Sequence, residues 1–196
     1  MDNRVELGPA AARLAALVQG VRDEQLAGKT PCEEYSVEVL LQHIDGLSQA
    51  FTAAAQKNLG PLTAAPTGSK PPALEAGWRL RIQAQLEAMA RAWESPEAWE
   101  GMTQAGGIDL PGSVAGLVAA DELAIHGWDL ARATGQPFEV DAGALGAATW
   151  FVEEMSQPGQ SREGLFGPAL PVPEGATDLE RVIALSGRDP RWTAAS

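Results

Sequence analysis

The sequence predicts an all-α protein, a helical bundle with four principal helices and a short C-terminal helical extension. Two observations predict this fold. Apolar residues recur three and four positions apart over the long segments, as in amphipathic helices. Stretches rich in glycine and proline separate these segments, and no series of alternating strands is present. The 196 residues suit a single domain, residues 1–196, with the bundle over about 7–155 and the extension over about 156–196.

The first helix is expected over residues 9–20, because Pro9 fits a first helical turn and the apolar residues that follow it have helical spacing. The second helix is expected to begin after Ser36, a good N-cap, and to run to about residue 57. Its apolar stripe includes His43 and is formed by Leu40, Ile44, Leu47 and Phe51.

Residues 60–72 are rich in Gly, Pro, Ser and Thr and are expected to form a loop. A third helix is expected over residues 72–93, where Leu, Trp, Ile and Met residues share one face. Three glycines within residues 99–111 favour a short extended excursion, and Trp99 is a candidate for the mouth of a pocket.

The fourth helix is expected over residues 113–134 and is expected to stop at Gly135. Asp141 is expected to cap a fifth helix over residues 142–155. The Pro- and Gly-rich segment that follows is expected to be irregular. Asp178 is then expected to cap a short last helix over residues 179–185.

Composition excludes several classes of protein. The formal net charge of -12 repels a phosphate backbone, so nucleic acid is not an expected partner. No apolar run approaches the roughly 18 residues that a membrane span needs, and no secretory signal opens the chain. The single cysteine, Cys32, excludes an internal disulfide and a zinc site built on several thiolates. We expect a cytoplasmic protein, and a homodimer stays open.

The two histidines of the chain, His43 and His126, each lie in the apolar face of a long helix. Glu122 precedes His126 by four residues, so both side chains project from one helical face. A carboxylate that points into a bundle is costly without a cation or a partner. The three residues are therefore candidate metal ligands. Hydrogen-bonded core histidines and an ordinary helical Glu–His contact are the alternative interpretation.

Three stretches carry a family resemblance: residues 30–43, beginning Thr30-Pro31-Cys32, residues 121–135, which contain His-Gly-Trp-Asp-Leu-Ala-Arg-Ala-Thr-Gly, and residues 185–190. They resemble the N-terminal, metal-binding domain of mycothiol-dependent maleylpyruvate isomerases, within the DinB-like superfamily. The resemblance implies a DinB-like four-helix bundle whose metal ligands are His43, Glu122 and His126. Relatives often have Trp where this chain has Tyr35, a change that is expected to alter packing only.

Two histidines and one glutamate leave a coordination position open, as in catalytic zinc sites. Zn²⁺ is the expected metal, and Fe²⁺ and Ni²⁺ also suit these ligands. The resemblance implies that mycothiol or a similar small thiol takes the open position and reacts with an electrophilic substrate, as in a thiol-dependent S-transferase or isomerase. The alternative is a non-catalytic metal-binding or regulatory protein that retains the fold.

Five further residues lie where a role at the site is conceivable. Asp129 could orient His126, or be a surface carboxylate. Arg79 and Arg81 could hold a polar part of the thiol, although such arginines more often lie on the surface. Cys32 is expected to be a packing residue rather than a nucleophile. Asp45 is expected to point away from His43 into solvent.

Overall fold

The computed structural model describes residues 4–66, 73–162 and 164–194. Its elements are α1 (Gly8–Gly20), the 3-10 turn η1 (Asp23–Gln25), α2 (Val37–Ala55), α3 (Pro61–Ala64), α4 (Trp78–Ala92), α5 (Pro96–Trp99), β1 (Met102–Ala105), β2 (Ile108–Pro111), α6 (Gly112–Thr134), α7 (Ala142–Glu154) and α8 (Asp178–Leu185). The described residues are mostly helical, which confirms the all-α prediction.

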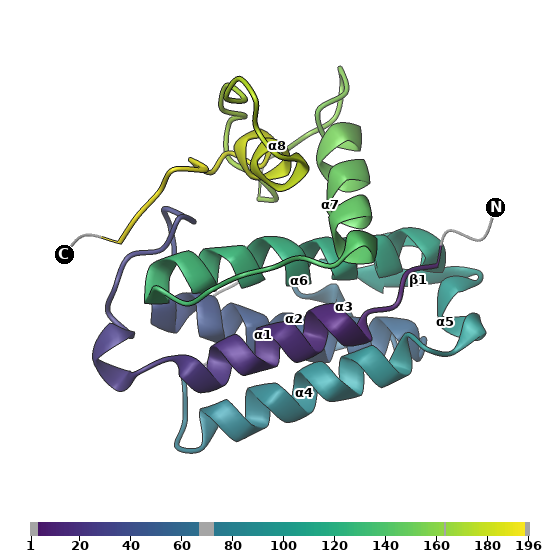
Figure 1. The fold of residues 1–196 in the computed structure, drawn as a ribbon. Coiled ribbons are helices and arrows are strands. Elements are labelled where there is room, and N and C mark those ends of the chain that lie inside the picture. The colour runs from purple at the N-terminus through teal and green to yellow at the C-terminus, as the bar shows by residue number, and fades with distance from the viewer. Residues whose placement is uncertain (1–3, 67–72, 163, 195–196) are drawn as a thin grey trace.

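Helices α1, α2, α4 and α6 form the bundle and lie side by side (Figure 1). Helix α6 contacts α1 and α2, and α4 closes the other side of the same two helices. The core between them is built from large side chains that are almost completely buried: Leu14, Leu40, Leu41, Ile44, Ile82, Leu86, Met89, Leu123 and Leu130. Burial of this apolar surface is the main force that holds α2 against α6, and it thereby positions the candidate ligands.

Local signals set several helix ends as expected. The hydroxyl of Ser36 accepts a hydrogen bond from the backbone N–H of Val39 at 3.3 Å. The carboxylate of Asp141 accepts one from Ala144 at 2.9 Å. Gly135 ends α6 in the left-handed conformation, with a φ of 70°. These contacts satisfy backbone groups that a helix end leaves without partners.

Two helix starts differ from the predictions. The third long helix, α4, begins at Trp78 rather than near residue 72, because Gly77 has a φ of 77° and interrupts the helical backbone. Pro72 itself lies outside the described residues. The N-cap of α8 is Thr177 rather than Asp178, since Thr177 and Glu180 form a reciprocal capping box.

The predicted extended excursion is an antiparallel hairpin, in which Met102 pairs with Pro111 and Ala105 with Ile108. The expectation for Trp99 was wrong, because its side chain is buried and its indole donates to the carbonyl of Trp93 at 2.8 Å. Both indoles pack on Gly116 of α6 so closely that a Cβ there would lie 2.4 Å from Trp99. A missing side chain on α6 therefore provides the space that these rings fill.

The C-terminal part of the chain returns to the bundle. Helix α7 stands steeply on α6, α8 packs against α7, and the chain after α8 runs back toward the segment that precedes α2 (Figure 1). This return brings residues near the end of the sequence beside the C-terminal half of α6. Within the described residues, no helix combines the length and hydropathy needed to cross a membrane.

Candidate metal centre

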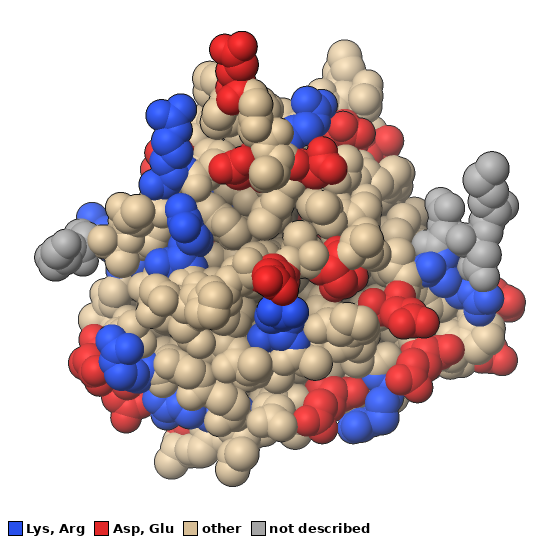
Figure 2. Space-filling view, in the orientation of Figure 1, with Lys and Arg blue, Asp and Glu red and all other residues tan. Residues whose placement is uncertain are grey.

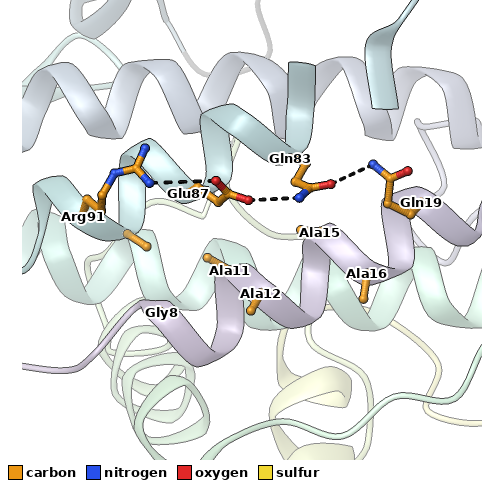
Figure 3. Close-up of a pocket in the computed structure, with 10 residues that line it drawn as sticks. Gly8, Ala11, Ala12, Ala15, Ala16, Gln19, Gln83, Glu87 and Arg91 are labelled. Atoms are coloured by element: carbon orange, nitrogen blue, oxygen red, sulfur yellow. Dashed lines mark hydrogen bonds and ion pairs between the residues drawn. The ribbon is translucent and has the colours of Figure 1, made fainter. Parts of the chain in front are cut away.

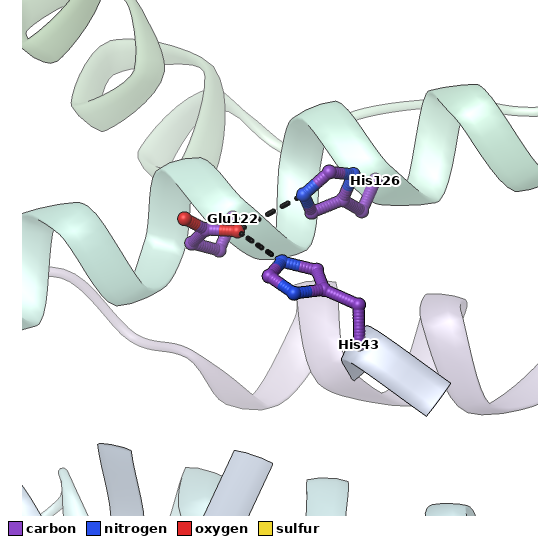
Figure 4. Close-up of side chains that lie close together, drawn as sticks. All are labelled: His43, Glu122 and His126. Carbon is purple, nitrogen blue, oxygen red and sulfur yellow. Dashed lines mark hydrogen bonds and ion pairs between the residues drawn. The ribbon is translucent and has the colours of Figure 1, made fainter. Parts of the chain in front are cut away.

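Helices α2 and α6 bring the three candidate ligands together (Figure 4). The Nε2 atom of His43 lies 3.3 Å from Oε2 of Glu122, and the Nε2 atom of His126 lies 3.1 Å from the same oxygen. One ligand atom from each residue can be chosen so that all three lie within 4.8 Å of one another. The structure thus places all three predicted ligands in one cluster, although His43 and Glu122 are 79 positions apart in the sequence.

The cluster has one accessible side. The side chains of His43 and Glu122 are 29% and 22% exposed, whereas that of His126 is 9% exposed. His126 therefore forms the inner wall of the site, and small molecules can approach from the side of His43 and Glu122.

The electrostatics of the cluster keep the carboxylate charged. Burial alone would raise the pKa of Glu122, but hydrogen bonds with His126 and His43 outweigh burial and hold it below its ordinary value. Burial also opposes a charge on His126, yet its contacts with Asp129 and Glu122 raise its pKa to about 9. A divalent cation bound at Nε2 of His126 would replace the proton that this ring otherwise holds.

The carboxylate of Asp129 forms a hydrogen bond with Nδ1 of His126, the ring nitrogen that does not face Glu122. Its Oδ2 atom lies 3.0 Å from Nδ1 of His126, and the Asp129 side chain is fully buried. Arg188, from the segment after α8, donates to Asp129 through Nε and Nη2 at 2.9–3.1 Å. The interpretation of Asp129 as a surface carboxylate is therefore wrong. The sequence reasoning missed Arg188, although residues 185–190 stood among the stretches that carry the family resemblance.

A second buried carboxyl, that of Asp121, adjoins the site. Burial and the neighbouring charge of Glu122 raise the pKa of Asp121 well above its ordinary value. Its Oδ1 atom is buried without a hydrogen-bond partner. Burial therefore disfavours the charged form of Asp121, whereas the histidines favour the charged form of Glu122.

Tyr35 covers the two histidines. Its ring centroid lies 5.4 Å from that of His43 and 6.4 Å from that of His126. The sequence assigned this position to packing alone, and the structure adds that the packing is against both candidate ligands. Nearby Cys32 is partly buried, and burial raises the pKa of its thiol to about 11, which favours the expected packing role over that of a nucleophile.

The other candidate residues make contacts elsewhere. Arg79 donates to the carbonyl of Val21 at 2.7 Å and to Asp23 at 2.6 Å, and none of these contacts involves the cluster. Arg81 pairs with Asp45 at 3.1 Å. The expectation that Asp45 is solvated was wrong: its side chain is 5% exposed, because α4 packs over this face of α2.

The donor set fits a divalent metal. Bonds of about 2.0–2.1 Å in tetrahedral geometry separate neighbouring donor atoms by about 3.3–3.4 Å. The two distances from Oε2 of Glu122 to the Nε2 atoms of the histidines, 3.1 and 3.3 Å, are close to this spacing. Imidazole nitrogen and carboxylate oxygen suit Zn²⁺ and Fe²⁺.

A surface cleft of about 460 Å³ runs between α1 and α4 over small residues, and Gln19, Gln83, Glu87 and Arg91 line one side of it (Figure 3). None of the three candidate ligands lines it. Another cleft, of about 380 Å³, is lined by residues 27–30, Glu33, Tyr35, Ser36 and Trp192. Tyr35 therefore lines this cleft and also packs against both histidines. On the face in Figure 2, acidic and basic side chains are interspersed, without a continuous basic area.

Comparisons with known proteins find relatives of this chain in sequence and in fold. Two uncharacterized proteins of Mycobacterium tuberculosis, from strains CDC 1551 / Oshkosh and ATCC 25618 / H37Rv, are each 30% identical over 183 residues, which cover 90% of this chain and 92% of the relative. Two crystal structures of the mycothiol-dependent maleylpyruvate isomerase, one of them a histidine-to-alanine mutant, share the fold. Their TM-scores are 0.59 and 0.55 at 14% and 16% identity, over 79% and 74% of this chain and 70% and 66% of theirs.

The profile of one sequence family covers most of the bundle. It is described as the mycothiol maleylpyruvate isomerase N-terminal domain and matches residues 7–131, a range that contains His43, Glu122 and His126. The chain belongs to the mycothiol maleylpyruvate isomerase N-terminal domain family.

Proposed function

We propose that His43, Glu122 and His126 bind one divalent metal, and that the protein is a thiol-dependent S-transferase or isomerase. The observation that carries this proposal is a three-residue donor set with one side exposed. A structural zinc site is usually closed by four protein ligands, whereas a catalytic site keeps a position for water or substrate. Membership of a family named for a mycothiol enzyme supports mycothiol, or a similar low-molecular-weight thiol, as the co-substrate.

Each residue would have a separate role in such a site. Glu122 supplies the negative charge, and the two imidazoles supply neutral donors. Asp129 holds Nδ1 of His126, which leaves Nε2 directed at Glu122. A bound divalent metal lowers the pKa of a coordinated thiol, and the thiolate is the nucleophile. Addition of the thiol to an unsaturated substrate followed by its departure is isomerisation, and a thiol that stays attached is S-transfer.

The surroundings of the cluster suit a small polar co-substrate. The cleft of about 380 Å³ is lined by Tyr35, which also packs against the histidines. Its lining includes Lys29, Glu33 and Ser36, whose side chains can form hydrogen bonds. We assign Arg79 and Arg81 no part in binding the thiol, because each is engaged by other residues of the chain.

A non-catalytic, metal-binding protein is the second candidate. It shares the ligands but predicts no thiol chemistry. The exposed side of His43 and Glu122 favours the enzyme, because a purely structural metal gains nothing from access to solvent.

The first test is the metal content of the purified protein. We expect close to one Zn²⁺, Fe²⁺ or Ni²⁺ per chain in the wild type, and strong loss in His126→Ala and Glu122→Gln. Glu87→Gln is the matched control, because Glu87 is an exposed carboxylate on α4 that lies outside the cluster. A metal-free wild type, even after reconstitution, would refute the metal site and the enzyme with it.

The second test separates the two candidates. The metal-loaded protein is mixed with mycothiol and a panel of electrophiles that includes maleylpyruvate, and thiol consumption and product isomerisation are followed. Turnover that requires Glu122 supports the enzyme. A protein that binds stoichiometric metal but turns over no member of the panel is the non-catalytic candidate.

A further inference from the structure

Arg188 is a buried cation near the C-terminus whose side chain contacts the C-terminal half of α6. Its side chain is 7% exposed, and it contacts a carboxylate that is fully buried. Its Nε lies 2.9 Å from Oδ1 and 3.1 Å from Oδ2 of Asp129, and its Nη2 lies 3.0 Å from Oδ2. A guanidinium that grips both carboxylate oxygens fixes their orientation as well as their charge.

The carboxylate held in this way is the one that meets His126. Oδ2 of Asp129 accepts a hydrogen bond from Nη2 of Arg188 and also lies 3.0 Å from Nδ1 of His126. With Nδ1 committed as a donor, Nε2 is the nitrogen that is free to bind a metal, and the ring plane is set. Partners that orient a ligating histidine in this way raise metal affinity.

The segment that carries Arg188 is itself held firmly. The backbone N–H of Arg188 donates to Ile183 at 3.1 Å, and its Nη1 donates to the carbonyl of Ser186 at 3.2 Å. Gly187 has a φ of 86° and lies so close to Gly167 that a Cβ would come within 2.8 Å of that backbone. Arg132 of α6 donates to the carbonyl of Pro190 at 3.2 Å. The contacts on both sides of Arg188 leave its side chain little freedom to turn away.

We propose that Arg188 is a positioning residue of the metal centre, which acts through Asp129 to orient His126. The C-terminal extension is therefore a working part of the site, although the family profile ends at residue 131. This inference rests on the proposed metal site and deepens it.

The test measures metal binding rather than turnover. Zn²⁺ affinity is determined by competition with a chromophoric chelator, and the absorption spectrum of bound Co²⁺ reports the ligand geometry. We expect Arg188→Met to weaken Zn²⁺ binding about 10- to 100-fold and to change the Co²⁺ spectrum. Arg191→Met is the matched control, because Arg191 is an exposed arginine of the same tail, and it is expected to match the wild type.

Two results would overturn the proposal. One is an Arg188→Met protein with the affinity and Co²⁺ spectrum of the wild type. The other is an equal loss in Arg191→Met, which would indicate a general effect of the tail.

A double variant covers the case in which Arg188→Met does not fold because it leaves Asp129 unpaired. Asp129→Asn combined with Arg188→Met removes both charges together. If Arg188 acts through Asp129, the double variant loses no more affinity than Asp129→Asn alone, within about threefold. Its failure to fold, or a clear further loss beyond Asp129→Asn, would show that Arg188 has another role and contradict the proposal.

These outcomes are distinct from failure of the proposed function. A wild type that binds neither Zn²⁺ nor Co²⁺ removes the metal site altogether. A wild type that binds both, with Arg188→Met unchanged, removes only the role of Arg188.

Discussion

At the scale of single residues, the two histidines of the cluster are not equivalent. His126 is buried and has a carboxylate at each ring nitrogen, Glu122 at Nε2 and Asp129 at Nδ1. His43 is more exposed, and its Nε2 meets Glu122 alone. We therefore expect His126 to set the geometry of the site, and His43 to be the ligand nearer to the incoming substrate.

Cys32 gives a prediction about pH. Burial raises the pKa of its thiol from 9.0 to about 11, although the charge of Arg188 acts in the opposite direction. At pH 9 about half of the thiol is ionised in the unfolded chain and about one hundredth in the folded chain, so alkylation of the native protein should be about 50-fold slower. Reaction with iodoacetamide, with and without urea, measures the ratio.

The same pKa shift bears on stability. Because the pKa of Cys32 is higher in the folded than in the unfolded chain, burial of the neutral thiol favours folding. Its contribution to stability is complete below pH 9 and is lost between pH 9 and about 11. Equal alkylation rates in the native and urea-unfolded protein would contradict the burial of Cys32.

At the scale of elements, the ends of the helices depend on single residues. Gly135 shows this most clearly, because its φ of 70° places it where a Cβ meets the backbone unfavourably. The helix can then stop, and the chain can turn toward Pro137 and α7. Six residues later, Asp141 caps the start of α7 by accepting a hydrogen bond from the backbone N–H of Ala144.

A pair of glycine substitutions tests this account. Gly135→Ala should lower the free energy of unfolding by about 1–2 kcal/mol, since alanine pays the cost of the left-handed conformation. Gly146→Ala, in the middle of α7 where nothing lies within 4 Å of the added Cβ, should raise it by about 0.5–1 kcal/mol. Urea unfolding measures both, and effects of the same sign would show that the backbone conformation of Gly135 is not what matters.

At the scale of the whole molecule, the cluster ties together helices that are far apart in sequence. His43 belongs to α2 and Glu122 to α6, 79 positions apart in the sequence. The proposed metal site can form only in the folded chain, since the unfolded chain does not hold the three donors together. If the protein binds metal as proposed, metal binding should be coupled to folding stability.

Zinc should accordingly stabilise the fold. At a free Zn²⁺ concentration of about 100 times Kd, the free energy of unfolding should rise by about 2.7 kcal/mol. His126→Ala should show little of this gain, because it lacks the buried ligand. Urea unfolding with buffered Zn²⁺ and with chelator measures the difference, and an equal gain in the variant would place the bound zinc elsewhere.

Much of the fold could be predicted from the sequence, because its signals are local. The caps at Ser36 and Asp141 and the stop at Gly135 act within one helical turn, and each was confirmed. The spacing of Glu122 and His126 likewise follows from helical geometry. The start of α4 escaped prediction because nothing in the residues before Gly77 shows that its backbone is left-handed.

What the sequence determined by itself was the helical pattern and the faces on which His43, Glu122 and His126 lie. Only the tertiary structure decided which distant groups meet. Asp45 is buried because α4 covers it, and Asp129 meets Arg188 across 59 residues of sequence. Such pairs depend on how helices pack and how the C-terminal segment returns, and no local spacing encodes them, because burial and long-range charge pairing are properties of the folded whole.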